Sequence, residues 1–340
     1  MLRSLKVRHF RCFDSFETEF ADGLNFIVGP NARGKTSLLE AACVLLRLQS
    51  PRVTRLAPIV QHGRRGFVVD GRVDERHLQF YFSKERKKLA LDSVQQTTAH
   101  EYLQLGRVVW FATADIDLTR GASELRRRFL DFVCVQRESG YRTVLREYER
   151  ALRSRNLLLK KSSPPWREIH AFDAPLLESG QRLIDARARL CDELQAPAAA
   201  MHGAISEAKE HLHIEYSRGA GEDFVSALAD SRDADARLRQ TTVGPHRDDL
   251  AFSLNEVTAD HASEGQQRTL VLALKLGAAH LLAAHFDAPP LLLIDDVFGE
   301  LDLRRRNALL AALPKSAQKI VTTTHLDWLG EEHAHHVLRL

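Results

Sequence analysis

Two segments suited to handling phosphate lie near opposite ends of this chain, and their separation constrains its fold. Residues 29–36, G-P-N-A-R-G-K-T, fit the pattern G-x-x-x-x-G-K-[ST] of a phosphate-binding loop. Residues 291–296, L-L-L-I-D-D, have the apolar run of a strand buried on both faces, and this strand ends in two carboxylates. If both segments belong to one nucleotide-binding fold, a folded insertion must lie between its two halves.

Apolar patterning predicts the elements on both sides of the insertion. Before it we expect strands at residues 2–10, 15–20, 23–28, 66–73, 78–82 and 108–112, and a helix at residues 35–48. After it we expect strands at residues 249–254, 291–294 and 319–324, and helices at residues 267–284 and 302–312. Alternating strands and helices are typical of a parallel sheet. The predicted fold is α/β, with a parallel sheet, additional antiparallel strands and an inserted helical arm.

The insertion is predicted to be largely helical from residue 127 to residue 239. Residues 162–165, Pro175 and Pro197 are expected to divide it into several helices, because proline cannot continue a helix. A helix at residues 141–159 would be about 28 Å long, which makes a short arm rather than an extended coiled coil. We expect a discontinuous head at residues 1–134 and 240–340, and an arm at residues 135–239. Trp166 is expected to be a packing anchor of the arm.

Composition excludes some classes of protein. The chain has 340 residues, of which 44% are apolar and 27% charged, as in ordinary globular proteins. No uninterrupted apolar run reaches the roughly 18 residues that span a bilayer, and the N-terminus lacks the apolar segment of a signal peptide. The widely spaced cysteines, Cys12, Cys43, Cys134 and Cys191, are expected to be buried and reduced. We therefore expect a soluble, cytoplasmic protein.

Basic residues cluster although the net charge is only +3. The cluster begins with Arg126, Arg127 and Arg128 and continues to residue 161. It could form a surface that binds duplex DNA. It could equally be a solvated helix face, with Glu147 and Glu149 forming local ion pairs. Composition leaves the two interpretations open.

The phosphate loop is expected to lie between a strand and a helix, which is the context this motif needs. Backbone N–H groups of the loop would surround the phosphates of ATP, and the start of the helix would add its positive dipole. Lys35 would reach the outer phosphates, and the Thr36 hydroxyl would bind Mg²⁺. The residues expected at the nucleotide are Gly29, Pro30, Asn31, Ala32, Arg33, Gly34, Lys35, Thr36 and Ser37.

The two carboxylates after the second strand have distinct expected roles. A carboxylate at the carboxyl end of a parallel strand faces the nucleotide crevice. Asp295 would therefore hold Mg²⁺, directly or through water, and Asp296 would act as general base toward the attacking water.

A third segment opens the helix that precedes this strand. Residues 263–267, S-E-G-Q-Q, offer a serine hydroxyl, a glycine backbone and a helix N-terminus, which together can bind a γ-phosphate. Lys35 already occupies that place at the nucleotide of its own subunit. We therefore expect Ser263, with Gly265 and Gln266, to close over ATP held by a second subunit.

The order of these motifs resembles the ATPase head of ABC-type proteins of the SMC kind. The resemblance includes residues 29–36, 263–267, 291–296, 300–302 and 322–325. Finer motifs are similar to the RecF family of bacterial recombination mediators, at residues 5–11, 111–115, 126–131, 153–156 and 244–250. These matches cover nearly the whole chain, the arm included.

The resemblance implies further roles. Asp302 corresponds to a residue that crosses the dimer interface, and His325 to a histidine that senses the γ-phosphate. Gln61 lies near the expected position of a metal-sensing glutamine, and Arg52 or Arg55 could contact phosphate or be an ordinary surface arginine. The shorter Asp296 stands where most ABC heads have glutamate, which should slow hydrolysis.

The resemblance also implies the function. We expect a slow ATPase that dimerises with ATP, closes on double-stranded or gapped DNA and releases it after hydrolysis, in DNA replication, recombination, repair and the SOS response. Its implied partners are mediators of the RecR and RecO type. Alternatives from other classes are a structural scaffold and the regulator of a nuclease partner.

Two histidine groups have structural interpretations. His246 and Arg247 are expected to brace the arm against the head rather than to catalyse. His333, His335 and His336 near the end are expected in a solvated terminal strand, not in a metal site.

Overall fold

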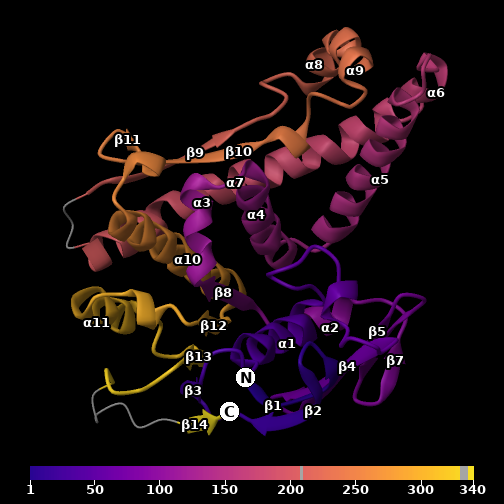
Figure 1. Ribbon diagram of the computed structural model, residues 1–340. Helices are drawn as coiled ribbons and strands as arrows, with labels where there is room; N and C mark the ends of the chain where they lie inside the picture. The colour runs from indigo at the N-terminus through magenta and orange to yellow at the C-terminus, as the bar shows by residue number, and fades with distance from the viewer. Residues whose placement is uncertain (207–209, 330–335) are drawn as a thin grey trace. The chain divides into compact units, whose positions relative to one another are not determined.

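A computed structural model describes residues 1–206, 210–329 and 336–340, and the chain divides into two compact units (Figure 1). The first unit comprises residues 1–115 and 278–340, and the second comprises residues 116–277. The predicted arm, 135–239, lies inside the second unit. The second unit is larger than the predicted arm, because residues 116–134 and 240–277 on either side of the arm also belong to it.

The first unit contains a five-stranded parallel sheet. Its order is β14-β3-β13-β12-β8, built from β3 (Leu24–Val28), β8 (Val108–Ala112), β12 (Leu291–Asp295), β13 (Lys319–Thr323) and β14 (His336–Arg339). Its inner strands are almost wholly buried, as expected for strands covered on both faces. Because all five strands run parallel, Val28, Asp295 and Thr323 end at one edge of the sheet. The predicted parallel sheet is confirmed.

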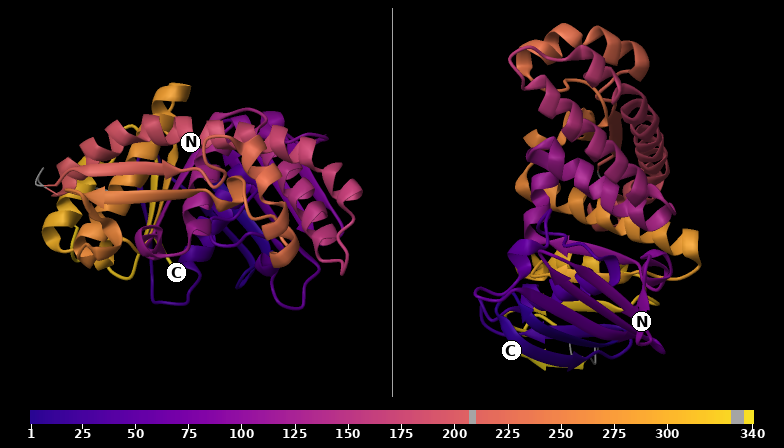
Figure 2. Two further views of the ribbon diagram at one scale, coloured as in Figure 1. Left: turned by 90° about the horizontal axis from the view of Figure 1, so that it is seen from above. Right: turned by 90° about the vertical axis from the view of Figure 1, so that its right-hand side faces the viewer.

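A six-stranded antiparallel sheet completes the first unit (Figure 2). Its order is β2-β1-β4-β5-β6-β7, from β1 (Leu2–Phe10), β2 (Phe13–Glu19), β4 (Gly66–Val73), β5 (Arg76–Ser83), β6 (Lys87–Leu91) and β7 (Val94–Gln96). Helix α1 (Lys35–Arg47) contacts strands of both sheets, and all its residues but Thr36 are buried. A helix that is buried on every side is typical of a core. The remaining elements are η1 (Ala57–Ile59), α2 (His100–Gln104), η2 (Thr113–Ile116, shared with the second unit), η5 (Phe298–Glu300) and α11 (Leu303–Ala312).

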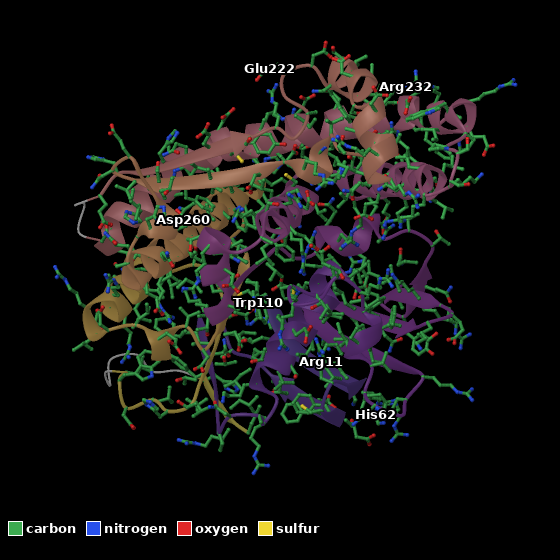
Figure 3. All side chains as sticks on the ribbon, turned by 45° about the horizontal axis from the view of Figure 1, so that its top comes forward. Arg11, His62, Trp110, Glu222, Arg232 and Asp260 are labelled. Carbon is green, nitrogen blue, oxygen red and sulfur yellow. The ribbon has the colours of Figure 1, made fainter. Side chains whose placement is uncertain are left out.

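The second unit is mainly helical. Its helices are α3 (Asp117–Arg120), α4 (Ser123–Arg137), α5 (Tyr141–Leu159), α6 (Trp166–His170), α7 (Asp173–Ser206), α8 (Phe224–Asp230), α9 (Arg232–Leu238), η3 (Pro245–Arg247) and η4 (Ala259–His261). Helix α10 (Glu264–Phe286) starts in this unit, and its residues after Gly277 belong to the first unit. Glu222 and Arg232 mark the end of the unit that carries α8 and α9 (Figure 3). There Arg232 lies over the ring of Trp166, at 4.6 Å, so Trp166 does pack within the arm.

The second unit also contains a sheet, of which the sequence predicted only the strand at residues 249–254. Strands β9 (Leu212–Ser217), β10 (Asp249–Leu254) and β11 (Val257–Thr258) form an antiparallel sheet in the order β11-β10-β9. In β9 the buried Leu212 and Ile214 alternate with exposed neighbours, which is the strand pattern that the sequence offered. Strands β6, β7, β9 and β11 were not predicted, whereas β14 agrees with the terminal strand expected at His336.

Pro197 does not end a helix, so that prediction was wrong. Helix α7 is 34 residues long and passes through Pro197 without a break. Pro175 lies in the first turn of the same helix. A proline inside a helix costs about 3 kcal/mol, because its N–H is missing and its ring crowds the preceding turn. Close packing of α10 against α7 compensates for this cost. Gly277 of α10 lies so near to α7 that a Cβ placed on it would be 2.9 Å from the backbone nitrogen of Ala198. Burial of Leu194 and Ala198 on the same stretch adds apolar contact.

Helix α10 is long and apolar enough to cross a membrane, with a mean hydropathy of 1.5 in its most apolar window. Arg268 and Lys275 interrupt its apolar sequence. Since 67% of that window is buried inside the fold, α10 has the surroundings of a core helix.

Two buried arginines hold the second unit together. The guanidinium of Arg187 donates to Asp131 at 2.9 Å and to Asp248 at 2.9 Å. The guanidinium of Arg155 donates to Asp235 at 2.6 Å and to Thr241 at 2.9 Å. Charges this deeply buried are tolerated only when they are paired and hydrogen-bonded.

Candidate functional site

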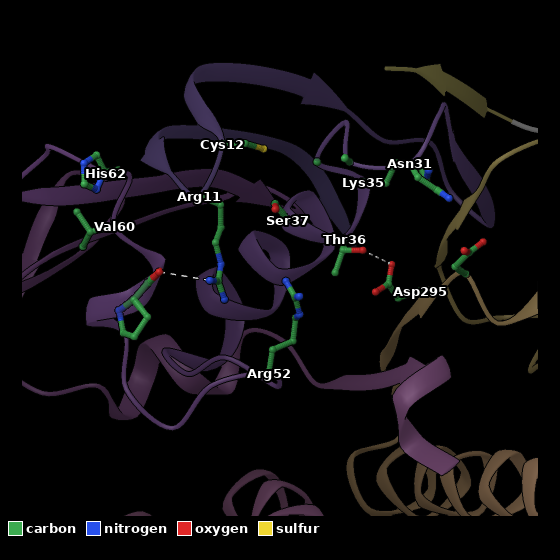
Figure 4. Close-up of a pocket in the computed structure, with 14 residues that line it drawn as sticks. Arg11, Cys12, Asn31, Lys35, Thr36, Ser37, Arg52, Val60, His62 and Asp295 are labelled. Carbon is green, nitrogen blue, oxygen red and sulfur yellow. Dashed lines mark hydrogen bonds between the residues drawn. The ribbon is translucent and has the colours of Figure 1, made fainter. Parts of the chain in front are cut away.

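A pocket of about 680 Å³ opens beside the phosphate loop in the first unit (Figure 4). The loop follows β3 and leads into α1, as predicted. Residues from the loop, from β12 and from two other segments line the pocket: Arg11, Cys12, Asn31, Ala32, Gly34, Lys35, Thr36, Ser37, Arg52, Pro58, Val60, His62, Asp295 and Asp296.

The loop requires glycine at position 34. Gly34 has φ +94°, a conformation that L side chains rarely adopt. A Cβ there would also lie 2.5 Å from the ring of Phe13 and 2.8 Å from Cys12 Sγ. Substitution of Gly34 would therefore displace the loop that shapes the pocket.

The Lys35 ammonium is held inside the loop. Its Nζ donates to the carbonyl oxygens of Gly29, at 2.6 Å, and Pro30, at 3.0 Å. The residue is 7% exposed and lines the pocket. The structure therefore places a desolvated cation where the phosphates of a nucleotide are expected.

Thr36, Asp295 and Thr322 form one hydrogen-bonded group at the carboxyl edge of the parallel sheet. Asp295 Oδ1 accepts from the hydroxyls of Thr36 and Thr322, both at 2.8 Å. The Thr322 hydroxyl accepts from the backbone N–H of Asp296 at 2.9 Å. Adjacent ends of β12 and β13 bring these residues together, so this part of the site follows from the strand register.

Burial raises the pKa of the Asp295 carboxyl above its ordinary value, and the hydrogen bonds from Thr36 and Thr322 oppose this effect. Burial also raises the pKa of Asp296, whereas the nearby Lys35 lowers it. Asp296 has φ +53°, a left-handed conformation that aspartate tolerates better than most residues.

The oxygen atoms at this edge fit Mg²⁺. This ion is usually bound in nucleotide sites by one or two protein oxygens, by phosphate and by water. The Thr36 hydroxyl and the Asp295 carboxylate supply two such oxygens 2.8 Å apart. No cluster of three His, Cys, Asp or Glu side chains that could hold a metal by itself occurs among the described residues.

Two arginines share one buried carboxylate beside the pocket. Glu40 of α1 has a side chain with 0% exposure and accepts two hydrogen bonds of 2.8 Å from the Arg11 guanidinium. It also accepts from Ser50 at 2.6 Å and from Arg52 at 3.4 Å. Arg11 and Arg52 both line the pocket (Figure 4), whereas Arg55 is exposed and does not. The Arg52 alternative is therefore the one that the geometry favours.

The segment at residues 263–267 lies in the second unit, and paired hydrogen bonds fix its start. The Ser263 hydroxyl accepts from Gln266 N at 3.3 Å, and Gln266 Oε1 accepts from Ser263 N at 2.7 Å. This reciprocal pair is a capping box. The buried side chain of Gln267 donates to the carbonyls of Ala259, Asp260 and Ala262 and so holds the preceding turn.

Comparisons with known proteins identify the family. Residues 1–338 match the model of the RecF/RecN/SMC N-terminal domain. The DNA replication and repair protein RecF of Synechococcus sp. strain JA-2-3B'a(2-13) is 37% identical, covering 96% of this chain and 91% of that protein. RecF of Lactococcus lactis is 32% identical, with 96% and 94% covered. The chain belongs to the RecF family.

Solved RecF structures agree with this assignment. The recombination mediator RecF with ATP in the RecFOR pathway is 29% identical, with a TM-score of 0.86 over 95% of this chain and 92% of that one. An Smc head bound to the C-winged helix domain of ScpA is 13% identical with a TM-score of 0.53, which supports the fold alone. The predicted ABC-type head of the RecF and SMC kind is thus confirmed, and the chain has the fold of an ATP-binding ATPase.

Two RecF-type residues implied by resemblance lie on loops of the first unit. His325 follows β13, its side chain is 59% exposed, and its charge helps to lower the pKa of Asp296. Trp328 donates to the carbonyl of His325 at 3.0 Å and stacks on Phe298 at 5.0 Å, which fixes this loop. Asp302 caps α11 by accepting from Arg305 N at 2.9 Å.

Other predicted residues lie away from these groups. Gln61 is not among the pocket-lining residues, although Oε1 of its side chain is buried without a hydrogen-bond partner among the described residues. His333 and His335 lie outside the described residues. His336 begins β14. Cys12 was predicted to be buried but is exposed at the pocket, whereas Cys43, Cys134 and Cys191 are buried.

The arginines predicted to contact DNA have internal partners. Arg126 donates to Asp249 at 2.6 Å and to the carbonyl of Gly121 at 2.8 Å, with 13% of its side chain exposed. Arg127 donates to the carbonyl of Asp248 at 2.6 Å. Arg128 also has a partner within the protein. These interactions brace α4 inside the second unit and support a structural role for Arg126 and Arg127, so a DNA contact at these residues stays a prediction.

Sequence reasoning missed several pocket residues. Arg11 is part of the motif at residues 5–11 that carries the resemblance, but this motif did not indicate that Arg11 would line the pocket. Cys12, Pro58, Val60 and His62 come from segments without a nucleotide motif. Glu40 lies five residues after Lys35 among apolar residues of the predicted helix. Because it is buried in the structure, its charge needs a basic partner, and this could have indicated nearby arginines.

Proposed function

We propose that this protein is an ATP-gated DNA-binding ATPase of recombinational repair. Two copies would close on two ATP molecules, each held by the phosphate loop of one copy and by Ser263 of the other. The closed dimer would hold double-stranded or gapped DNA, and hydrolysis would release it. ATP can drive such a cycle if it binds the closed state more tightly than the open state.

The observation that carries the proposal is the group formed by Lys35, Thr36, Asp295 and Asp296 in the pocket. The desolvated ammonium of Lys35 can move from two carbonyls to phosphate oxygens, which are stronger acceptors. Thr36 and Asp295 would hold Mg²⁺, which would neutralise charge on the phosphates. RecF is solved with ATP, and that relationship supports the same ligand here.

Asp296 is the candidate general base. It follows β12 directly, so its carboxyl lies at the edge where the phosphates would end. Lys35 lowers and burial raises its pKa, and the net direction is upward. A carboxylate with a raised pKa is a stronger base toward the attacking water. His325 and Asp302 would act at the γ-phosphate and at the dimer interface.

The DNA surface is better assigned to α5 than to Arg126, Arg127 and Arg128. Arg146, Arg150 and Arg153 are exposed at positions i, i+4 and i+7, so they follow one face of α5. Among the described residues, Arg153 forms a surface ion pair of 3.4 Å with Glu149. Exposed arginines in such a row can contact successive phosphates of a duplex.

The remaining parts of the proposal follow the relatives. RecF is described as a recombination mediator of the RecFOR pathway, so partners of the RecR and RecO type are proposed here. The relatives are bacterial DNA replication and repair proteins, which supports a cytoplasmic location, where the chromosome lies.

The test is binding of a labelled gapped duplex to Asp296→Asn with and without Mg-ATP. This substitution should allow closure and prevent hydrolysis, so we expect tight binding only with Mg-ATP. Equal binding in both conditions would show that ATP does not gate DNA binding. No binding in either would favour the scaffold or the nuclease-regulator alternative.

The same assay maps the DNA surface. Changing Arg146, Arg150 and Arg153 to glutamine in the Asp296→Asn protein should weaken binding and flatten its salt dependence by about 0.9 per lost phosphate contact. A matched control changes Arg189, an exposed arginine of α7 that pairs with Glu138. Identical salt slopes for the α5 variant and its parent would remove this face from the DNA surface.

A further inference from the structure

Glu210 contacts the segment at residues 263–267, although it belongs to no motif. It lies between α7 and β9, in the same unit as Ser263. Its Oε1 accepts from the side-chain nitrogen of Gln266 at 2.6 Å. The contact joins residues 56 positions apart in the sequence. It is therefore a tertiary contact rather than part of the local capping box.

This contact decides how the Gln266 amide is oriented. An ionised carboxylate can only accept hydrogen bonds, so the amide must turn its NH₂ group toward Glu210. Its oxygen then faces Ser263 and accepts from the Ser263 N–H at 2.7 Å. With the amide reversed, that N–H would meet a donor. Glu210 thereby selects the one orientation in which the capping box can form.

The capping box in turn orients the Ser263 hydroxyl. The hydroxyl oxygen accepts from Gln266 N at 3.3 Å, which leaves the O–H proton to donate outward. Ser263 is exposed, as a group that meets another molecule must be. Gln267 fixes the preceding turn through three carbonyls, so Ser263 is held on both sides.

Glu210 is itself held from behind. Its side chain is 19% exposed, and its Oε2 lies 3.6 Å from Nε2 of His202 on α7. His202 is fully buried, and this Nε2 has no hydrogen-bond partner among the described residues. The carboxylate is thus confined between the end of α7 and the start of α10, with one oxygen committed to Gln266.

We propose that Glu210 is a positioning residue for the nucleotide-dependent dimer. It fixes the amide of Gln266, and through it the Ser263 hydroxyl that would meet the γ-phosphate held by a second copy. The inference rests on the proposed function, because it assigns a second copy of the chain as the partner of Ser263. Glu210 touches no nucleotide in this scheme.

The test compares Glu210→Ala with Glu215→Ala, a matched control at an exposed glutamate of β9. Dimerisation with Mg-ATP is measured by analytical ultracentrifugation in the Asp296→Asn protein, and kcat is measured in the otherwise native protein. Loss of one charge-assisted hydrogen bond should weaken dimerisation and lower kcat by about 10-fold. ATP affinity of the monomer should not change, because the pocket lies in the other unit. Equal dimerisation of the two variants would overturn the inference.

A charge exchange separates positioning from a folding defect. Gln266→Glu alone places two carboxylates together and should impair dimerisation. The double variant Glu210→Gln, Gln266→Glu restores a donor opposite an acceptor and leaves a glutamate oxygen for the Ser263 N–H, so it should recover most of the loss. Failure of the double variant to recover would also overturn the inference.

Ser263→Arg shows which idea has failed. If it abolishes dimerisation while Glu210→Ala does not, the inference about Glu210 is wrong and the proposed dimer stands. If Ser263→Arg dimerises normally with Mg-ATP, the proposed function itself is wrong and Glu210 has no dimer to position.

Discussion

Glu40 in the first unit and Arg187 in the second are both buried charges shared by two partners of opposite sign. Glu40 lies between Arg11 and Arg52, which leaves one positive charge in surplus. Arg187 lies between Asp131 and Asp248, which leaves one negative charge in surplus. The two groups therefore have net charges of opposite sign, and their surroundings differ.

The surplus charge of the Arg187 group is saturated inside the protein. Asp248 has a side chain with 0% exposure and accepts from Gly219 N at 2.8 Å and from the Tyr216 hydroxyl. Asp131 accepts from the Tyr141 hydroxyl at 2.5 Å. Every carboxylate of the group therefore has hydrogen-bond donors besides the arginine.

The surplus charge of the Glu40 group reaches the pocket. The side chain of Arg52 is 44% exposed, and its bond to Glu40 is a long one of 3.4 Å. A charge that is only loosely held and faces a cavity is available to an anionic ligand. A buried ion group therefore belongs to the structural core when its surplus charge is satisfied, and to a binding site when that charge is left at a pocket.

The largest expected effect comes from breaking the structural member of the pair. Arg187→Leu leaves the buried Asp248 and the partly buried Asp131 without their cation, which should destabilise the second unit by about 3–5 kcal/mol. Urea unfolding, followed by the helical circular dichroism signal, measures the change. Arg189→Leu is the matched control on the same helix: its partner Glu138 is at the surface, 3.1 Å away, and the expected cost is below about 1 kcal/mol. Similar losses for both variants would refute the structural role of the Arg187 group.

A smaller effect should appear with pH in the same unit. Burial lowers the pKa of His246 to about 4, while its Nε2 donates to the Thr241 carbonyl at 2.9 Å and its Nδ1 accepts from Tyr148 at 2.6 Å. Because the folded pKa lies below the ordinary value, the unfolded chain binds the proton first. Stability is therefore complete above about pH 6.5 and falls by up to about 3 kcal/mol as the pH approaches 4.

The measurement is unfolding free energy against pH for the native protein and for His246→Gln. Acidic residues titrate in both proteins, so their difference isolates the histidine. The native protein should lose more stability than the variant between pH 6.5 and 5. Parallel curves would show that His246 is not held neutral by its buried position.

The sequence predicted the parts of the site that depend on local patterns. The phosphate loop, α1 and the strand before Asp295 each occupy a short continuous segment, so glycine spacing and apolar runs were sufficient to find them. The sequence also predicted that the phosphate loop and Asp295 lie close together, because parallel strands bring their carboxyl ends to one edge of the sheet.

The remaining features depend on contacts between distant segments. The Arg11–Glu40 pair joins residues 29 positions apart, and the Gln266–Glu210 contact joins residues 56 apart. Asp249, the carboxylate that pairs with Arg126, is 123 positions away, so the basic run by itself did not indicate this internal contact. Pro197 was misjudged for the same reason, since the packing of α10 that accommodates it is tertiary.

The smallest expected effect on folding, and the sharpest test of the comparison, belongs to Arg52. If its surplus charge serves a ligand, Arg52→Ala should leave stability within about 0.5 kcal/mol and weaken ATP binding about 10-fold, which corresponds to about 1.4 kcal/mol. Arg55→Ala is the matched control, because Arg55 is exposed and close in sequence but does not line the pocket. Equilibrium titration with ATP and thermal unfolding give the two quantities. Equal ATP affinity for both variants would make Arg52 an ordinary surface arginine. A large loss of stability would instead show that the Glu40 group, like the Arg187 group, has a structural role rather than a role in ligand binding.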